Sequence, residues 1–145
     1  MSVKMAKTMK EIHPDSILLF KQGTFYHAYG KDALILLYYF DYKIKTVEKN
    51  VPTCGFPQNA INRVSAKLER EKINYITVDV KNDNDIVNQE DFKNLNRFEE
   101  VLEIAKKIVN LKRRIYAIES YLLDEIKSEN IHKKIIEIEN ILYEN

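Results

Sequence analysis

The sequence predicts an α+β fold, in which a mixed β-sheet with packed helices is followed by a C-terminal helical extension. Strand-like apolar runs lie in the first 80 residues, and apolar spacings of three and four take over from about residue 88. All three prolines lie before residue 58, so the second half lacks the strongest helix breaker. We therefore expect an α/β module over residues 1–82 and a helical extension over residues 88–145.

The first elements follow from local patterns. Residues 3–12 carry apolar side chains three apart, which predicts a short amphipathic helix that ends before Pro14. Residues 16–20 are apolar without alternation, as in a central strand covered on both faces. Residues 21–23 supply a turn into a second strand over residues 24–28. We expect these two strands to form a hairpin.

The middle of the first half mixes helix, strand and loop signals. Asp32 can cap a helix over residues 33–40, although the aromatic and β-branched residues of that segment leave a buried strand as an alternative. Residues 42–47 alternate weakly as a strand, and the two prolines of residues 51–57 predict an irregular loop. A helix over residues 58–71 is expected to turn inward an apolar stripe of Ala60, Ile61, Val64 and Leu68.

Alternation returns once before the helical tail begins. Residues 74–80 read as a strand, and the polar residues 81–85 as a turn. Helical spacing then links Phe92, Leu95, Phe98, Leu102, Ala105 and Val109, and, after a shift near Asn110 that predicts a bend or register change, Leu111, Ile115, Ile118, Leu122 and Ile126. After an interruption at residues 128–130, apolar residues of 131–142 recur at spacings of four, three and four. We expect a helical hairpin, or a coiled coil that forms a dimer interface.

Composition narrows the class of protein. The sequence has 23 Lys and Arg residues and 22 Asp and Glu residues, so its net charge is close to zero. Any basic surface must therefore be local. The single cysteine, Cys54, excludes an internal disulfide framework and fits a reducing, cytoplasmic environment. No apolar run is long enough to span a membrane, and the N-terminus lacks the apolar core of a signal peptide. We therefore expect a soluble, cytoplasmic and unprocessed protein.

The adjacent rings of Phe25 and Tyr26 raise the main functional question. Neighbouring side chains of a strand point to opposite faces, so one ring points away from the core unless both pack inside a twisted strand end. Gly23, just before the pair, permits close approach of a ligand. An outward ring can act as a wedge in DNA, at an unstacking cost of about a few kcal/mol per step. Stacking of a base on the ring contributes roughly 1–3 kcal/mol, so binding is favourable only where base pairing is already weak, as at mismatched, bulged or frayed sites.

Three segments carry a resemblance to a known family. H-P-D-S-I-L-L-F-K-Q-G-T-F-Y-H-A-Y-G-K-D-A, V-P-T-C-G-F-P-Q-N-A and K-L-E-R-E-K-I-N-Y-I-T-V closely resemble the N-terminal mismatch-recognition domain of the MutS family. That family has a glycine, any residue and Phe-Tyr-Glu, then an Asp-Ala pair, then a P-x-x-G-x-P-x-x-A loop that leads into a helix. The matching residues are Gly23, Phe25, Tyr26, Asp32, Ala33, Pro52, Gly55, Pro57 and Ala60. The resemblance covers about residues 7–80.

The resemblance implies roles for three adjacent residues. Phe25 would stack on an unpaired or mispaired base in the minor groove, and Tyr26 would face the core. The family's glutamate, which hydrogen-bonds the displaced base, is replaced by His27. A histidine can donate and accept hydrogen bonds and does not repel phosphates, so we expect tighter but less discriminating binding. The chain has no G-x-x-x-x-G-K phosphate loop followed by Ser or Thr, and we expect no ATPase and no other enzymatic activity or cofactor.

Several other side chains are candidates for phosphate contact, metal binding or catalysis. The candidates for phosphate contact are Lys21, Arg63, Lys67 and Arg70, the last three sharing a helix face, with solvated surface charge as the alternative. The basic cluster at residues 106–114 is surrounded by acidic residues, which favours an exposed, salt-bridged face. His13, His27 and His132 have no metal-ligand spacing, and Cys54 is expected to be a buried structural thiol. We attribute a nuclease-like set of Asp15, Asp41 and Lys43 to chance.

Together these features predict a non-enzymatic nucleic-acid-binding module. Its partners would be mismatched, bulged or kinked DNA, or structured RNA. Small stand-alone MutS-like proteins are known beside the reverse transcriptases of diversity-generating retroelements, so an accessory role in DNA repair or in such diversification is expected. The C-terminal helices would contact a reverse transcriptase, another protein or a second copy. The alternative is a protein-protein interaction or regulatory module that keeps the MutS-like scaffold but has lost DNA recognition.

Overall fold

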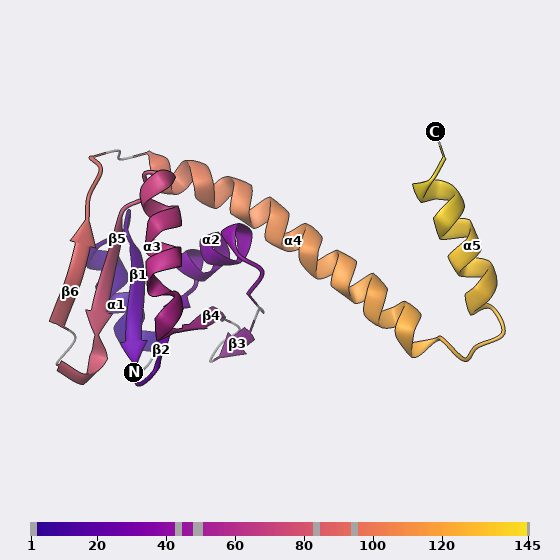
Figure 1. Ribbon diagram of the computed structural model, residues 1–145, viewed down its shortest axis with the longest axis horizontal. Coiled ribbons are helices and arrows are strands. Elements are labelled where there is room, and N and C mark those ends of the chain that lie inside the picture. Colours follow the sequence, from indigo (N-terminus) through magenta and orange to yellow (C-terminus); the bar gives the residue numbers. More distant parts are fainter. Residues whose placement is uncertain (1–2, 43–44, 48–50, 83–84, 94–95, 145) are drawn as a thin grey trace. The chain divides into compact units, whose positions relative to one another are not determined.

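The computed structural model describes residues 3–42, 45–47, 51–82, 85–93 and 96–144 (Figure 1). The chain forms two compact units, Met1–Val109 and Asn110–Asn145, which are treated separately below. The first unit holds a sheet with helices, and the described part of the second contains helices and a turn region but no strand. The predicted α+β fold with C-terminal helices is confirmed.

The sheet has six strands in the described part of the chain. They are β1 Ile17–Gln22, β2 Phe25–Tyr29, β3 Lys45–Val47, β4 Val51–Pro57, β5 Tyr75–Asp79 and β6 Asp85–Glu90. Their order is β3-β4-β2-β1-β5-β6. β1 and β5 are parallel, and the other neighbours are antiparallel. The sheet is therefore mixed, and β1 and β2 form the expected hairpin.

Helices account for most of the remaining chain. They are α1 Val3–Ile12, α2 Lys31–Tyr39, α3 Ile61–Arg70, α4 Arg97–Asp124 and α5 Ile131–Leu142, with short 3-10 turns at Gln58–Ala60 and Val80–Asn82. The alternative of a buried strand over residues 33–40 is excluded by α2. None of the described helices combines the length and the apolar character needed to cross a bilayer.

Each face of the sheet has its own apolar cluster. Ile17 and Leu19 of β1 belong to the larger cluster, which α2, α3 and the start of α4 complete. Leu18 and Phe20, which alternate with them, belong to a smaller cluster that includes Ala6 of α1. β1 is thus buried on both sides, which explains its unbroken apolar sequence.

The segment of residues 51–57 is a strand, and the predicted irregular loop is wrong. Cys54 and Phe56, on either side of the exposed Gly55, are buried and enter the larger cluster. Pro52 and Pro57 lie near the two ends of the strand, where a missing N–H interrupts pairing least. The prolines therefore mark the limits of β4 and do not prevent it.

β6 has no counterpart among the predicted elements, which place a polar turn and an interdomain boundary over residues 81–87. Its sequence D-I-V-N-Q-E is largely exposed, so it has no buried face to create an alternating pattern. A register shift between Thr77 and Val78 interrupts its pairing with β5. Pairing with the neighbouring strand, which is a tertiary contact, defines this element.

The first compact unit extends into α4. The predicted helical pattern begins near residue 88, whereas α4 begins at Arg97, and Leu95 lies outside the described residues. Side chains of the first turns of α4 complete the core of the first unit: Phe98, Val101, Leu102, Ala105 and Val109. The two units therefore divide within α4 after Val109, because burial against the sheet ends there, and α4 continues to Asp124.

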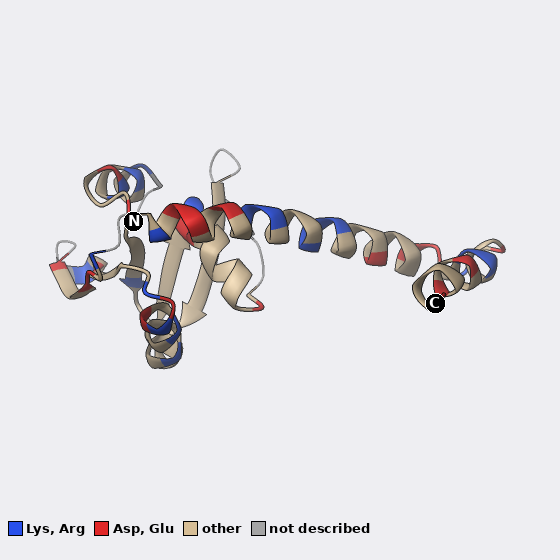
Figure 2. Cartoon of the chain, turned by 90° about the horizontal axis from the view of Figure 1, so that it is seen from above, with Lys and Arg blue, Asp and Glu red and all other residues tan. Residues whose placement is uncertain are grey.

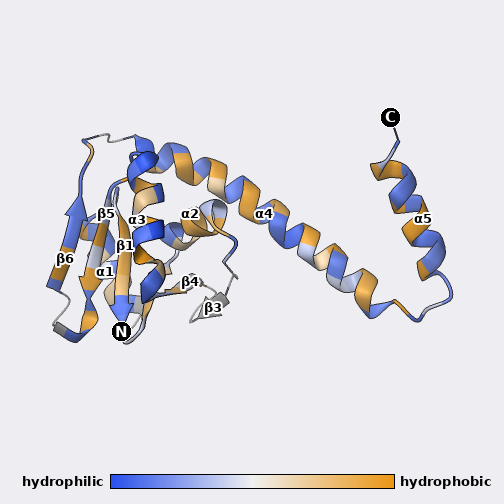
Figure 3. Cartoon of the chain, in the orientation of Figure 1, coloured by the Kyte–Doolittle hydropathy of each residue, from blue (hydrophilic) through white to orange (hydrophobic). Residues whose placement is uncertain are grey.

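The second unit contains the rest of α4, a turn region and α5. Figure 2 shows basic residues in the middle of α4 and acidic residues toward its end. Figure 3 shows apolar residues recurring along both helices. Lys134 of α5 donates a hydrogen bond to the hydroxyl oxygen of Tyr121 at 2.8 Å. The interruption predicted at residues 128–130 is confirmed by the start of α5 at Ile131.

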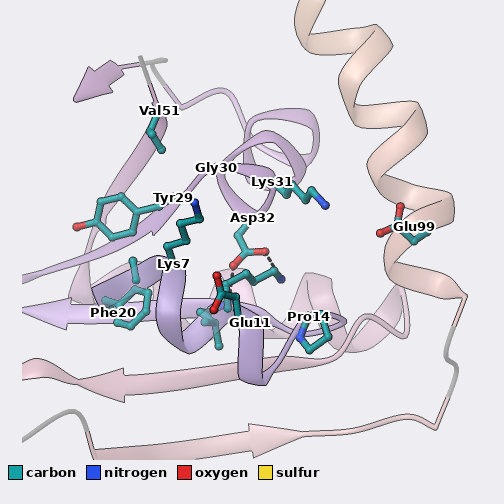
Figure 4. A pocket seen from close by; sticks show the side chains of 13 residues that line it. Lys7, Glu11, Pro14, Phe20, Tyr29, Gly30, Lys31, Asp32, Val51 and Glu99 are labelled. Atoms are coloured by element: carbon teal, nitrogen blue, oxygen red, sulfur yellow. Dashed lines mark hydrogen bonds and ion pairs between the residues drawn. The ribbon is translucent and has the colours of Figure 1, made fainter. Parts of the chain in front are cut away.

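Asp32 connects four elements of the first unit (Figure 4). It does not cap α2, which begins after Gly30 without a side-chain cap. Its Oδ1 accepts a hydrogen bond from Lys10 Nζ at 2.6 Å and its Oδ2 accepts one from the Leu18 amide at 3.0 Å. Lys10 Nζ also lies 4.0 Å from the centre of the Phe98 ring. Burial raises the pKa of Asp32, and the Lys10 ammonium opposes that shift.

We predict that Asp32→Asn destabilises the chain by about 3 kcal/mol, because Lys10 then keeps a largely buried charge without its counter-ion. The free energy of unfolding in urea measures this loss. The double variant Lys10→Met, Asp32→Asn removes both charges but keeps an acceptor for the Leu18 amide, so it should be more stable than Asp32→Asn. A single variant within about 0.5 kcal/mol of wild type would contradict the prediction.

Candidate nucleic-acid interface

The hairpin of β1 and β2 sets the position of the two rings. Gln22 pairs with Phe25, so Gly23 and Thr24 form a two-residue turn. Gly23 has a φ of 62°, a conformation that a residue with a Cβ adopts only at a cost. The glycine therefore permits the tight turn after which Phe25 begins β2.

Tyr26 packs into an aromatic stack on the face covered by α2 and α3. Its ring lies 5.5 Å from that of Phe56 with an interplanar angle of 15°. Phe56 lies 5.7 Å from Tyr42 on its other side, at 13°. Burial raises the pKa of the Tyr26 hydroxyl, and the nearby Asp79 carboxylate adds to the shift. Tyr26 thus faces the core, as the resemblance implies.

Phe25 points to the opposite face and is 46% exposed. It lies between Gln22 of β1 and Pro57 of β4 in the strand register. Residues of α1 pack with Leu18 and Phe20 on this face, whereas Phe25 belongs to neither apolar cluster. The possibility that both rings lie in the core is excluded, and Phe25 is the outward ring.

His27 lies on the same face as Phe25, two positions along β2. The centres of the two rings are 6.4 Å apart. Gly55 is its partner on β4, and a Cβ added at Gly55 would lie only 3.1 Å from His27 Nδ1. Gly55 therefore leaves space for the imidazole. Exposed Phe25 and half-buried His27 together form an aromatic and hydrogen-bonding pair on this face of the sheet.

The four basic residues predicted to contact phosphates do not gather around Phe25. Lys21 is the register partner of Tyr26, so it lies on the face opposite Phe25. Arg63 Nη2 donates a hydrogen bond to the Tyr42 hydroxyl at 2.9 Å.

Lys67 Nζ lies 5.1 Å from the centre of the Tyr39 ring. Arg70 is exposed in the last turn of α3. Helical spacing places Arg63, Lys67 and Arg70 near one another on α3, but only tertiary packing decides which face of the sheet that helix covers.

Gln22 belongs to the candidate site and was missed by sequence reasoning. It is the register partner of Phe25, and its Nε2 is buried without a hydrogen-bond partner in the described part of the chain. The sequence could have predicted this pairing, because Gln22 and Phe25 flank a two-residue hairpin turn, and residues in those positions face each other across the two strands. A buried donor beside an exposed ring adds polarity to this end of the sheet.

A cavity of about 410 Å³ lies beside α1 (Figure 4). Leu18, Phe20 and Tyr29 contribute apolar walls, and the buried charges of Lys10 and Asp32 contact each other there. Neither Phe25 nor His27 lines it.

Cys54 is buried in β4, as expected for a structural thiol. Burial raises its pKa to about 12, which favours the neutral thiol at physiological pH. Among the described residues, no three His, Cys, Asp or Glu side chains gather in an arrangement that could hold a metal ion.

We predict that the two adjacent rings differ in how much they stabilise the fold. Tyr26→Ala should destabilise the chain by about 2 kcal/mol or more, because it removes the end of a stack and opens the core. Phe25→Ala should cost less than about 1 kcal/mol, because that ring is largely solvated. Urea unfolding curves with equal slopes give both values. Equal losses for the two variants would contradict the assignment of faces.

Comparison with known proteins agrees with this geometry. A family model described as MutS domain I matches residues 2–138. The DNA mismatch repair protein MutS of Parabacteroides distasonis is 39% identical over 66 residues, which are 43% of this chain and 8% of that protein. The MutS of Desulfatibacillum aliphaticivorans is 36% identical over 70 residues, 46% of this chain and 8% of that protein.

A third relative, the MutS of Myxococcus xanthus, is 37% identical over 67 residues, which are 43% of this chain and 7% of that protein. The chain therefore spans less than a tenth of the length of the relatives it matches. The family model covers most of the chain, the sheet is mixed as the resemblance implies, and Phe25 stands at the expected position. The chain belongs to the MutS domain I family.

Proposed function

We propose that this chain is a non-enzymatic nucleic-acid-binding module that stacks Phe25 on an unpaired or mispaired base. One observation carries the proposal: Phe25 is 46% exposed at the start of β2, directly after a tight turn, while the adjacent Tyr26 lies in the core. An exposed ring that is held by a rigid hairpin loses little conformational freedom when a base stacks on it.

The cost of unstacking bases and the gain from stacking on Phe25 together indicate which nucleic acids should bind. Opening a base step costs about a few kcal/mol, and stacking on an aromatic side chain returns roughly 1–3 kcal/mol per base. In a perfect duplex the exchange is unfavourable or neutral, whereas at a mismatch, bulge or frayed end much of the cost is already met. Mismatched, bulged or kinked DNA is therefore the preferred partner, and structured RNA with unpaired bases is the second.

His27 is proposed to hydrogen-bond the base that Phe25 displaces. It lies on the same face, and a neutral imidazole can donate through one nitrogen and accept through the other. It carries no negative charge that would repel the phosphates. We expect a stronger but less selective interaction than a carboxylate would provide at this position.

Lys21, at the turn end of β1, is one candidate for phosphate contact, and its side chain lies on the face opposite Phe25. Arg70 is exposed and is a second candidate. Arg63 and Lys67 contact aromatic rings in this structure, so for them a role in packing competes with phosphate binding.

The biological role is proposed from the relatives. Proteins named for DNA mismatch repair share part of this sequence, which supports a role in DNA repair. The more specific proposal is a cytoplasmic accessory factor in DNA repair or in reverse-transcriptase-linked diversification. A reverse transcriptase or another protein would contact the C-terminal helices. The alternative, a protein interaction module without DNA recognition, is favoured by the replacement of the family's glutamate by His27 and by the exposed apolar residues of the second unit.

We predict that Phe25→Ala weakens binding to a duplex with a single-base bulge by roughly 5- to 100-fold, because the stacking energy is lost. Fluorescence anisotropy at one fixed salt concentration measures the dissociation constants, since phosphate contacts depend strongly on salt. Phe25→Trp should retain binding. Tyr116→Ala, which removes an exposed ring of the second unit, serves as the matched control and should bind like wild type.

Two results would overturn the proposed function. One is the finding that the wild-type chain shows no salt-dependent binding to bulged DNA, mismatched DNA or structured RNA. The other is equal binding by wild type and Phe25→Ala, provided that the variant unfolds at the wild-type urea concentration. Either result would favour the interaction module.

We predict that His27→Glu lowers affinity for perfect duplex more than for bulged duplex, because the new carboxylate repels phosphates but can still accept a hydrogen bond from a displaced base. The dissociation constant for perfect duplex divided by that for bulged duplex, both measured in one buffer, should therefore be larger for His27→Glu than for wild type. His27→Gln is the neutral control. An unchanged ratio for His27→Glu would exclude a contact between this side chain and the base.

A further inference from the structure

The second unit exposes an unusual amount of apolar surface. None of its described residues is buried, yet Leu111, Ile115 and Ile118 of α4, and Ile126 just after it, are each about half exposed or more. Isolated apolar side chains are normal on a surface, but a continuous series along one helix marks an interaction surface. α5 adds further exposed residues, among them Ile141 and Leu142.

The apolar residues of α4 follow the spacing of a coiled-coil seam. Leu111, Ile115, Ile118 and Leu122 are separated by four, three and four positions. This spacing keeps the side chains on one stripe of a helix, which needs a second helix to cover it. The stripe begins where burial in the first unit ends, after Val109.

We propose that this stripe pairs with the same stripe of a second copy of the chain, in antiparallel orientation. The distribution of charge identifies both the occupant and its direction. Lys112, Arg113 and Arg114 lie at one end of the stripe, and Glu119, Asp124 and Glu125 lie at the other (Figure 2). A parallel pair would place like charges together, whereas a two-fold axis through the middle of the stripe brings opposite charges together.

The antiparallel arrangement also has a defined register. With Leu111 facing Leu122 of the second copy, Ile115 faces Ile118, so every layer of the seam is apolar. In the same register Lys112 and Glu119 of the second copy flank the seam on the same side, so opposite charges lie beside each other. A surface that complements itself under a two-fold axis needs no other partner, which is why a second copy is favoured over a different protein.

This dimer is independent of the proposed function. It would give each particle two exposed Phe25 rings, which raises the avidity for nucleic acid with several unpaired bases. If the chain is monomeric, the role proposed for Phe25 is unaffected.

The test is the mass of the full chain in solution. Sedimentation equilibrium should give a mass of twice 17.1 kDa. Ile118→Asp should weaken the dimer by roughly 30-fold or more, because it places a charge in the centre of the seam. Leu123→Asp is the matched control, because Leu123 and Ile118 are both 58% exposed but Leu123 lies off the stripe. That control should stay within about 3-fold of wild type.

Cysteine pairs test the direction of the two helices. In a Cys54→Ala background, antiparallel pairing predicts that Leu111→Cys and Leu122→Cys chains form a disulfide only when they are mixed. Each variant linking to itself would indicate parallel helices and overturn the proposal.

A monomeric wild type at about 100 μM would also overturn the proposal. So would equal effects of Ile118→Asp and Leu123→Asp on the dimer. Circular dichroism checks that the helices persist, and if Ile118→Asp loses helix, Ile115→Asn replaces it.

Discussion

The stack of Tyr26 on Phe56 is the contact on which the exposed face of this protein depends. Phe56 is fully buried and lies between Tyr26 and Tyr42, so the Tyr26 side chain has one direction in which it can pack. Because side chains alternate along a strand, the direction of Tyr26 determines the direction of Phe25. The outward ring is thus a consequence of core packing on the other side of the sheet.

The buried Asp32 stabilises the arrangement of the helices and the sheet in the first unit. It accepts hydrogen bonds from the Lys10 ammonium and the Leu18 amide, and Lys10 in turn lies over the Phe98 ring. One carboxylate therefore connects α1, β1, α2 and α4. In the MutS family an Asp-Ala pair follows the aromatic motif, and in this chain the aspartate of that pair has a structural role.

Local patterns predicted the elements whose residues bury one clear face. The hairpin, the helix over residues 3–12 and the strand near residue 75 follow directly from apolar spacing and turn residues. The β4 strand was mistaken for a loop, because its two prolines are turn signals in isolation and strand limits in context. β6 carries no pattern at all, because both its faces are largely exposed. The packing of α4 on the sheet was not visible in the helical spacing alone.

The sequence by itself determined that this is an α+β protein with a helical tail and that its aromatic motif resembles that of MutS domain I, because these conclusions rest on residue types at fixed spacings. It also singled out Phe25, His27 and the basic residues. Only the tertiary structure decided which ring is exposed, that His27 joins it, and that Arg63 and Lys67 lie over aromatic rings beside α3. The reason is physical: spacing specifies which side chains share a face of one element, but the face that becomes buried depends on the elements that pack against it.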